Sequence, residues 1–141
     1  MNIYLDIDGT CIYDNDARAW DSASGLEEFV KALRPYDVYW LTTYCMDGDP
    51  TRARMILKAH LPQELHEDID RIKPTTWHRL KTEAIDFSKE FIWFDNNPSR
   101  EDREVLKQHV TSARQWLIEV HLDENPNRLQ DIAREVLTTR C

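Results

Sequence analysis

Short apolar segments that alternate with stretches of helical periodicity are the feature of this sequence that most restricts its fold. Apolar residues fill most positions of residues 38–41 and 90–95, and the segments 2–7 and 115–121 have a similar character. Continuous apolar runs of this length are typical of parallel strands that helices cover on both faces. The alternation predicts an α/β fold with a doubly wound, Rossmann-like and mostly parallel sheet of about five strands flanked by helices.

The segments between these strands indicate the remaining elements. Residues 66–72 alternate weakly and are predicted to form a short edge strand, the fifth of the sheet. Residues 11–23 are polar and are expected to form a loop with one hairpin-like turn. Ser24 with Glu27 has the pattern of a capping box, and Ser99 is a second candidate N-cap. Helices are expected over residues 24–33, 51–60, 74–88, 99–109 and 126–137.

Length and composition limit the kind of protein. A chain of 141 residues, 41% of them hydrophobic, is long enough for one globular domain over residues 1–141 and too short for two. The 26 acidic residues outnumber the 18 basic ones, which argues against a broad nucleic-acid-binding surface. Three cysteines without metal-type spacing indicate neither a disulfide framework nor a zinc site. Because no apolar run has membrane-spanning length and no signal peptide precedes the first strand, we expect a cytoplasmic protein with no membrane partner.

The most specific motif is D-I-D-G-T at residues 6–10, where the first strand ends. Residues i and i+2 of a strand point to one side, so Asp6 and Asp8 are expected on one face. Two carboxylates this close are costly to bury unless a cation or a proton lies between them. Gly9 permits a sharp turn and the close approach of a ligand, and the arrangement suits Mg²⁺. The competing interpretation is an Asx-rich turn after an edge strand.

Polar residues also follow other predicted strands. Thr42 and Thr43 end the segment that begins at residue 38, and Asp95 ends the segment that begins at residue 90. In a doubly wound sheet the carboxyl ends of the strands lie along one edge, and ligands bind in the crevice outside it. The sequence therefore predicts that these side chains and the two aspartates of the first motif lie close together.

In this order, the motifs resemble those of the haloacid dehalogenase-like hydrolase superfamily, whose members are mostly Mg²⁺-dependent phosphatases. D-x-D-G-T, an apolar strand ending in Thr42, a lysine ahead of the next apolar strand and a strand ending in Asp95 follow one another over nearly the whole chain. The resemblance implies a phosphomonoester hydrolase in which Asp6 is the nucleophile that forms an aspartyl-phosphate and Asp8 is the general acid/base. It also implies that Asp6, Asp95 and the backbone carbonyl of Asp8 hold Mg²⁺.

The resemblance further implies a phosphate-binding set. Thr42, with Thr43 beside it, would hydrogen-bond the phosphoryl oxygens, and a lysine would neutralise the phosphate and steady the nucleophile. Two lysines are candidates, Lys81 and Lys73, and Lys81 is favoured because Thr82 after it has the character of an N-cap.

Two positions near the last motif bear on metal binding. Asn96 stands where many relatives carry a second aspartate, which implies weaker affinity for the metal. Asp102 falls on a predicted helix and is expected at the surface.

The chain also resembles the members of this superfamily that have no cap domain. Neither interval that could hold one, residues 11–37 or residues 44–72, contains a folded cap by its pattern. The site is therefore expected to be open, and its partner is a phosphorylated substrate, with a large substrate or a nucleotide as candidates. Basic residues near the crevice by sequence position, for which solvation on a helix surface is the ordinary role, are Arg52, Arg54, Arg79 and Arg100.

A second function of another class remains open at this stage. The chain could be a catalytically weak, phosphatase-like binding or regulatory module that keeps the fold without turnover. The presence of both Asp6 and Asp8 favours the hydrolase, because a binding module does not need an acid/base.

Overall fold

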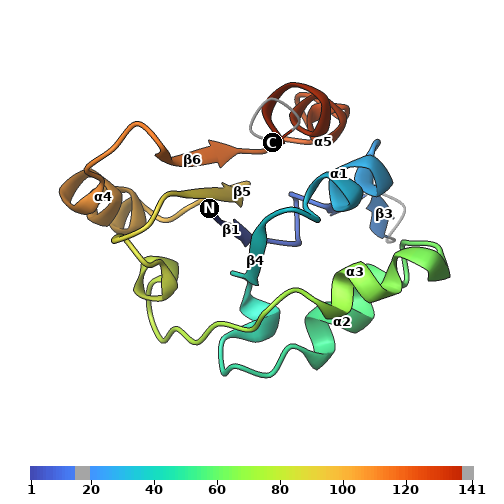
Figure 1. The fold of residues 1–141 in the computed structure, drawn as a ribbon, viewed down its shortest axis with the longest axis horizontal. Coiled ribbons are helices and arrows are strands. Elements are labelled where there is room, and N and C mark those ends of the chain that lie inside the picture. Colours follow the sequence, from blue (N-terminus) through green and yellow to red (C-terminus); the bar gives the residue numbers. More distant parts are fainter. Residues whose placement is uncertain (15–19, 138–141) are drawn as a thin grey trace.

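The fold is built on a four-stranded parallel sheet. The computed structural model describes residues 1–14 and 20–137. The strand order is β4-β1-β5-β6 (Figure 1). In the central strands Leu5 lies opposite Trp40 on one side and Phe94 on the other. The strands are β1 (Asn2–Leu5), β4 (Asp37–Trp40), β5 (Phe91–Asp95) and β6 (Gln115–Glu119).

The predicted α/β class with a Rossmann-like parallel sheet is confirmed, but the sheet has four strands where the sequence predicts about five. Residues of the expected edge strand form helix α3 (His66–Asp70) instead. Leu65, Ile69 and Ile72 are spaced for one face of a helix, and all three are buried. Just beyond them, Lys73 makes an isolated parallel bridge to Tyr39 on the outer side of β4.

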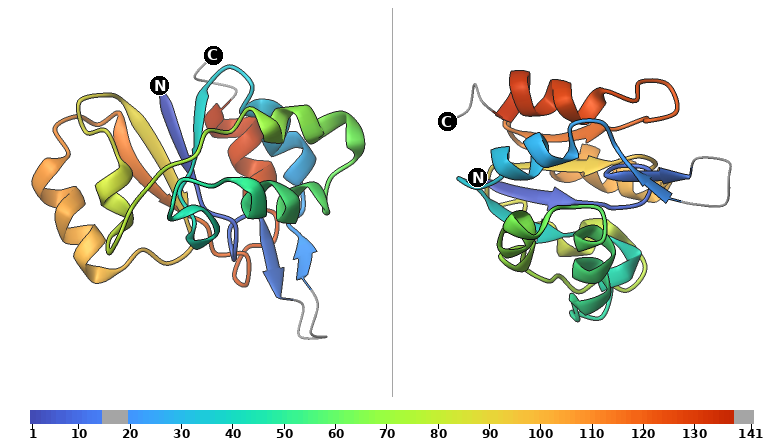
Figure 2. Two further views of the ribbon diagram at one scale, coloured as in Figure 1. Left: turned by 90° about the horizontal axis from the view of Figure 1, so that it is seen from below. Right: turned by 90° about the vertical axis from the view of Figure 1, so that its right-hand side faces the viewer.

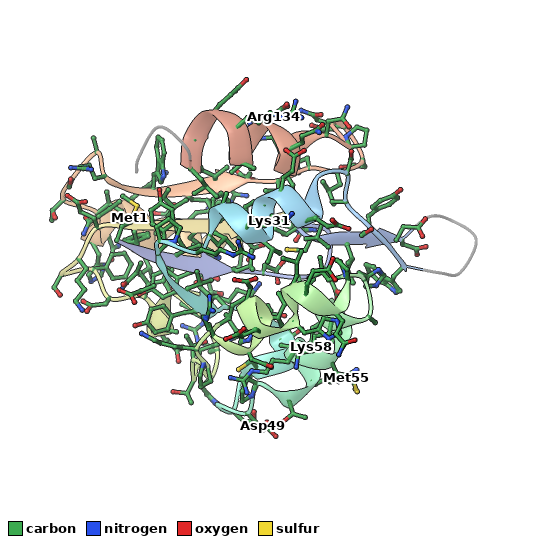
Figure 3. The ribbon with its side chains drawn as sticks, turned by 45° about the vertical axis from the view of Figure 1, so that its right-hand side comes forward. Met1, Lys31, Asp49, Met55, Lys58 and Arg134 are labelled. Carbon is green, nitrogen blue, oxygen red and sulfur yellow. The ribbon has the colours of Figure 1, made fainter. Side chains whose placement is uncertain are left out.

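Helices cover both faces of the sheet. Helix α4 lies on one face, together with a short 3₁₀ turn, and helices α1 and α5 lie on the other (Figure 1). Helix α3 contacts α1, and helix α2 packs against the other side of α3. Met55 of α2 projects from the molecule with 64% of its surface exposed (Figure 3). The bounds are α1 (Leu26–Ala32), α2 (Thr51–Lys58), α4 (Arg100–His109), α5 (Arg128–Asp131), a π-helical continuation (Ile132–Leu137) and 3₁₀ turns at Thr43–Cys45, Gln63–Leu65 and Lys81–Ala84.

The alternation of side chains along the strands divides the core into two clusters. Ile3 and Leu5 face α1 and α5, whereas Tyr4 between them faces α4. On the α1 side, the rings of Phe29 and Phe94 meet edge to face at 5.3 Å. On the α4 side, Tyr4 and Phe91 meet in the same way at 5.9 Å. Both faces of the sheet are therefore buried, which explains why its central strands are continuously apolar.

The helix expected over residues 74–88 does not form; only the 3₁₀ turn Lys81–Ala84 is helical there. The carboxylate of Glu83 accepts hydrogen bonds from the backbone N–H groups of His78, Arg79 and Leu80, at 2.9, 3.1 and 2.8 Å. These bonds satisfy donors that a helix would have used, so a side chain stabilises an irregular approach to the turn.

The two predicted helix caps differ in outcome. Ser99 caps α4 as expected, because its hydroxyl accepts from the backbone N–H of Asp102. Ser24 does not cap α1, which begins after Gly25 in the left-handed conformation (φ 79°) and has no side-chain cap.

The predicted hairpin follows the first motif. Strands β2 (Ile12–Asp14) and β3 (Trp20–Ser22) pair antiparallel, and the tip between them, residues 15–19, lies outside the described residues. The hairpin projects from the end of the sheet opposite the N-terminus (Figure 2). In the described part of the chain, none of the helices has the length and apolar character needed to cross a bilayer.

Candidate active site

Three strand ends bring polar residues to one edge of the sheet. Asp6 follows β1, Thr42 lies two residues beyond β4, and Asp95 is the last residue of β5. All three are buried, with Asp6 only 5% exposed. Because β1 lies between β4 and β5, their carboxyl ends are neighbours, as the sequence predicts for a doubly wound sheet.

Lys81 joins the two buried carboxylates. Its Nζ lies 3.2 Å from Oδ1 of Asp6 and 2.7 Å from Oδ2 of Asp95. The other oxygen of Asp95 accepts from the backbone N–H of Asn97 at 2.9 Å. Lys73, the second candidate lysine, is exposed and pairs with Asp37 at the start of β4, 3.4 Å away. The geometry thus brings Lys81 to the strand ends and leaves Lys73 at the opposite end of β4.

Burial and charge shift the protonation of this group. Burial, together with the negative charge of Asp95, raises the pKa of Asp6 to about 7, although Lys81 opposes the change. Burial alone would lower the pKa of Lys81, but the two carboxylates outweigh it and raise that pKa. Lys81 therefore remains a cation between two carboxyl groups. Burial, and then Asp6, raises the pKa of the Cys11 thiol, so this neighbouring sulfur stays protonated.

Asp8 is oriented by Tyr44, a residue that the sequence analysis did not single out. The hydroxyl of Tyr44 donates to Oδ2 of Asp8 at 2.6 Å. Burial, followed by the bond to Asp8, raises the pKa of Tyr44 to about 12, so the phenol remains a donor. The guanidinium of Arg52 lies over the Tyr44 ring, 4.8 Å from its centre. Oδ1 of Asp8 is buried and has no hydrogen-bond partner among the described residues.

The two threonines of the expected phosphate site have different surroundings. Thr42 is buried, and its hydroxyl accepts from the backbone N–H of Tyr44 at 3.3 Å, which starts the 3₁₀ turn. Thr43 is exposed at the first position of that turn. Near Asp6, Thr10 donates from its hydroxyl to Oδ2 at 3.4 Å. The structure therefore brings hydroxyl groups from two loops to the strand ends.

Close packing holds Asn96 against the loop after β1. Gly9 has φ 75°, and a Cβ built on it would lie 2.3 Å from Nδ2 of Asn96. A side chain at residue 9 would therefore both strain the backbone and displace Asn96.

Asp102 is not the surface residue that the sequence analysis expected, because it is only 4% exposed. One of its oxygens accepts from the backbone N–H and the hydroxyl of Thr82, at 2.9 and 2.8 Å, and the other accepts from the hydroxyl of Ser99 at 3.0 Å. Thr82 follows Lys81, so Asp102 fastens the lysine-bearing turn to α4. The S-x-x-D spacing from Ser99 is a capping-box pattern that could have identified it.

The arginines named from the sequence divide by environment. Arg54 donates to the backbone carbonyls of Asp70 and Ile72, and Arg79 pairs with Glu101. Both are thus used within the fold. Among the described residues, Arg52 is the arginine of this set that lies over the ring of Tyr44, whose hydroxyl donates to Asp8.

A cleft of about 890 Å³ opens beside Asp8. Asp8 and Gly9 line it together with residues 96–97, the β2–β3 hairpin and the loop at residues 120–123. Tyr13 and Trp20, from the two strands of the hairpin, are among the residues that line it.

The side chains at the strand ends offer carboxylate oxygens that could hold Mg²⁺. Asp6 and Asp95 already share one cationic partner, and carboxylate oxygens are the ligands that this hard ion prefers. Asp8 directs one carboxylate oxygen to Tyr44. Within residues 1–14 and 20–137, no three His, Cys, Asp or Glu side chains are grouped closely enough to hold a metal by themselves. The carboxylate pair fits the ion, and further ligands would have to be backbone oxygens, water or phosphate.

Comparisons with models of protein families, with curated proteins and with solved structures found no match to this chain.

Proposed function

We propose that this protein is a Mg²⁺-dependent phosphomonoester hydrolase that acts through an aspartyl-phosphate on Asp6. The observation that carries the proposal is the half-buried Lys81, 3.2 Å from Asp6 and 2.7 Å from Asp95 at the carboxyl edge of the sheet. A cation between two carboxylates at this edge is suited to binding a phosphoryl group beside a carboxylate nucleophile. The resemblance of the motifs to haloacid dehalogenase-like hydrolases supports the same function.

The residues would divide the reaction into two displacements. A carboxylate oxygen of Asp6 attacks phosphorus, and the bond from phosphorus to the ester oxygen breaks while Asp8 gives that oxygen a proton. In the second step Asp8 takes a proton from water, the water oxygen bonds to phosphorus, and the bond to Asp6 breaks to release phosphate. Lys81 favours the ionised form of Asp6 and offsets phosphate charge, and the Thr42 hydroxyl bonds a phosphoryl oxygen.

Asp6 and Asp95, with the backbone carbonyl of Asp8, would hold Mg²⁺. When bound, the ion supplies Lewis-acid stabilisation of charge on the phosphoryl oxygens. We further propose that the chain acts without a cap domain. A cytoplasmic location agrees with Cys11 and Cys45 being free thiols, as reducing compartments keep them.

The test is hydrolysis of p-nitrophenyl phosphate, with and without Mg²⁺, by the wild type and by Asp6→Asn. Asp37→Asn is a matched control, because this exposed aspartate lies at the opposite end of the sheet. We expect Mg²⁺-dependent hydrolysis that is lost in Asp6→Asn alone, and acid-quenched wild type that retains ³²P from labelled substrate. Circular dichroism checks that the variants are folded.

Other outcomes separate the alternatives. Equal, metal-independent hydrolysis by the wild type and Asp6→Asn would exclude the Asp6 mechanism. Phosphate binding without hydrolysis or labelling would instead support the binding or regulatory module.

A further inference from the structure

The cleft beside Asp8 lies where the leaving group of a phosphomonoester would lie. Asp8 lines this cleft, and neither Asp6 nor Lys81 does. In the proposed function Asp8 gives its proton to the ester oxygen, so the group attached to that oxygen must extend from the Asp8 side. The cleft, with a volume of about 890 Å³, is large enough for a ring system.

The hairpin forms one wall of the cleft and presents an exposed tryptophan there. Both Tyr13 and Trp20 line the cleft, but Tyr13 pairs with Asp21, so its ring lies on the other face of the hairpin and packs against the core. Trp20 is 46% exposed. The large hydrophobic side chains that are exposed in the described chain are Trp20, Met55 and Trp116, and of these only Trp20 lines the cleft. An exposed indole beside a candidate catalytic acid offers a stacking surface for a flat apolar group.

We propose that this cleft binds the leaving group of the substrate, and that this group carries an aromatic ring. The proposal rests on the proposed function and names its substrate class. Trp20 supplies the stacking surface.

The first test compares kcat/KM for 2-naphthylmethyl phosphate and butyl phosphate, two esters of primary alcohols. The wild type should prefer the naphthyl ester at least tenfold, and Trp20→Ala should reduce that preference about tenfold. Trp116→Ala is the matched control, since this exposed tryptophan on β6 does not line the cleft, and it should leave both rates unchanged. Equal rates on the two esters, or an equal loss on both in Trp20→Ala, would overturn the aromatic assignment.

Binding separates this inference from the proposed function. Calorimetry with the matching phosphonates, in which a methylene replaces the ester oxygen, needs no turnover. Tighter binding of the naphthyl phosphonate that depends on Trp20, without hydrolysis of any ester, would uphold the cleft assignment and reject the hydrolase. Hydrolysis without discrimination between the esters would reject only the cleft assignment.

Discussion

Lys81 determines how the protein tolerates two buried carboxylates. Asp6 and Asp95 lie on adjacent strands, where mutual repulsion and loss of hydration would both oppose ionisation. The ammonium group contacts both. Its positive charge is not enough to return Asp6 to ordinary behaviour, because burial and Asp95 still raise the pKa of Asp6 to about 7.

This raised pKa predicts how the stability of the metal-free protein depends on pH. Between the ordinary value of 3.8 and about 7, Asp6 binds a proton more tightly in the folded chain than in the unfolded one. The free energy of unfolding should therefore fall as pH rises through that window, by on the order of 3 kcal/mol. Urea unfolding in EDTA between pH 4 and pH 8 measures the change.

Asp6→Asn is the comparison for that experiment, since the amide does not titrate. Across this pH range, the free energy of unfolding of Asp6→Asn should fall much less than that of the wild type. An unchanged slope in Asp6→Asn would show that another group causes the dependence.

The loss of kcat/KM on removing the Tyr44 hydroxyl should depend on how much the leaving group of the ester needs a proton. Tyr44→Phe removes the donor to Oδ2 of Asp8 and keeps the ring beneath Arg52. We expect kcat/KM to fall about tenfold for butyl phosphate and much less for p-nitrophenyl phosphate, whose leaving group departs as an anion. Steady-state kinetics on the two esters gives the ratio.

Tyr39→Phe provides the control, because Tyr39 stacks on Tyr4 away from Asp8. It should affect neither ester. A loss in Tyr44→Phe that is the same for both esters would indicate a general structural role.

At the scale of single residues, the sequence is sufficient to place together the residues that lie at or just after the ends of strands. Asp6, Thr42 and Asp95 could be placed together because parallel strands end at one edge. Tyr44 could not, since its bond to Asp8 joins a 3₁₀ turn to a loop 36 residues away along the chain. For Asp102, the spacing from Ser99 could indicate a cap but not the bond to Thr82, 20 residues away. Strand periodicity carries no information on such contacts.

Among the elements, the 3₁₀ turn Lys81–Ala84 depends most on side chains. Glu83 accepts three backbone N–H groups on its N-terminal side, and Asp102 binds Thr82 from α4. A turn this short has little stability of its own. The position of Lys81 therefore depends on two carboxylates that lie outside the proposed phosphate site.

Asp102→Ala should loosen this turn. It leaves the buried N–H and hydroxyl of Thr82 without their acceptor and should lower the free energy of unfolding by about 2 kcal/mol. Because Lys81 adjoins Thr82, kcat should also fall at temperatures where the variant remains fully folded. Urea denaturation and steady-state kinetics measure the two effects.

Glu104→Ala is the matched control on the same helix, where Glu104 is exposed. It should change the free energy of unfolding by less than about 0.5 kcal/mol. A loss of stability in Asp102→Ala with unchanged kcat would mean that the turn does not need Asp102 to place Lys81.

The same turn shows why one element was predicted wrongly. Apolar residues over 74–88 have a helical spacing, but the backbone donors before the turn bond to Glu83 instead. The central strands were predicted correctly because burial on both faces leaves a continuous apolar signal. Patterns thus identified the elements that the core determines and missed one that polar side chains determine.

For the molecule as a whole, the sheet order sets a gradient of stability. Strands β1 and β5 each pair with neighbours on both sides, whereas β3 pairs only with β2 and all its residues are exposed. Amide hydrogen exchange should therefore be slowest in β1 and β5 and fastest, among the strands, in β3. Exchange followed by mass spectrometry tests this order, and protection of β3 equal to that of β1 would contradict it.

At this scale the sequence was sufficient for the α/β class and the parallel sheet. The number of strands was overestimated because residues 66–72 were too short for their alternation to be told from a helical pattern. The packing of Leu65 and Ile69 into the core decided in favour of α3.

The contact of Lys81 with Asp6 and Asp95 also bears on the order in which folding and ion binding occur. The chain brings its own counter-ion to the strand ends. A newly synthesised molecule can therefore reach its native fold before any divalent ion binds. In the proposed Mg²⁺-dependent hydrolase, the supply of the ion would then regulate how many molecules are active, while the number that fold would not depend on it.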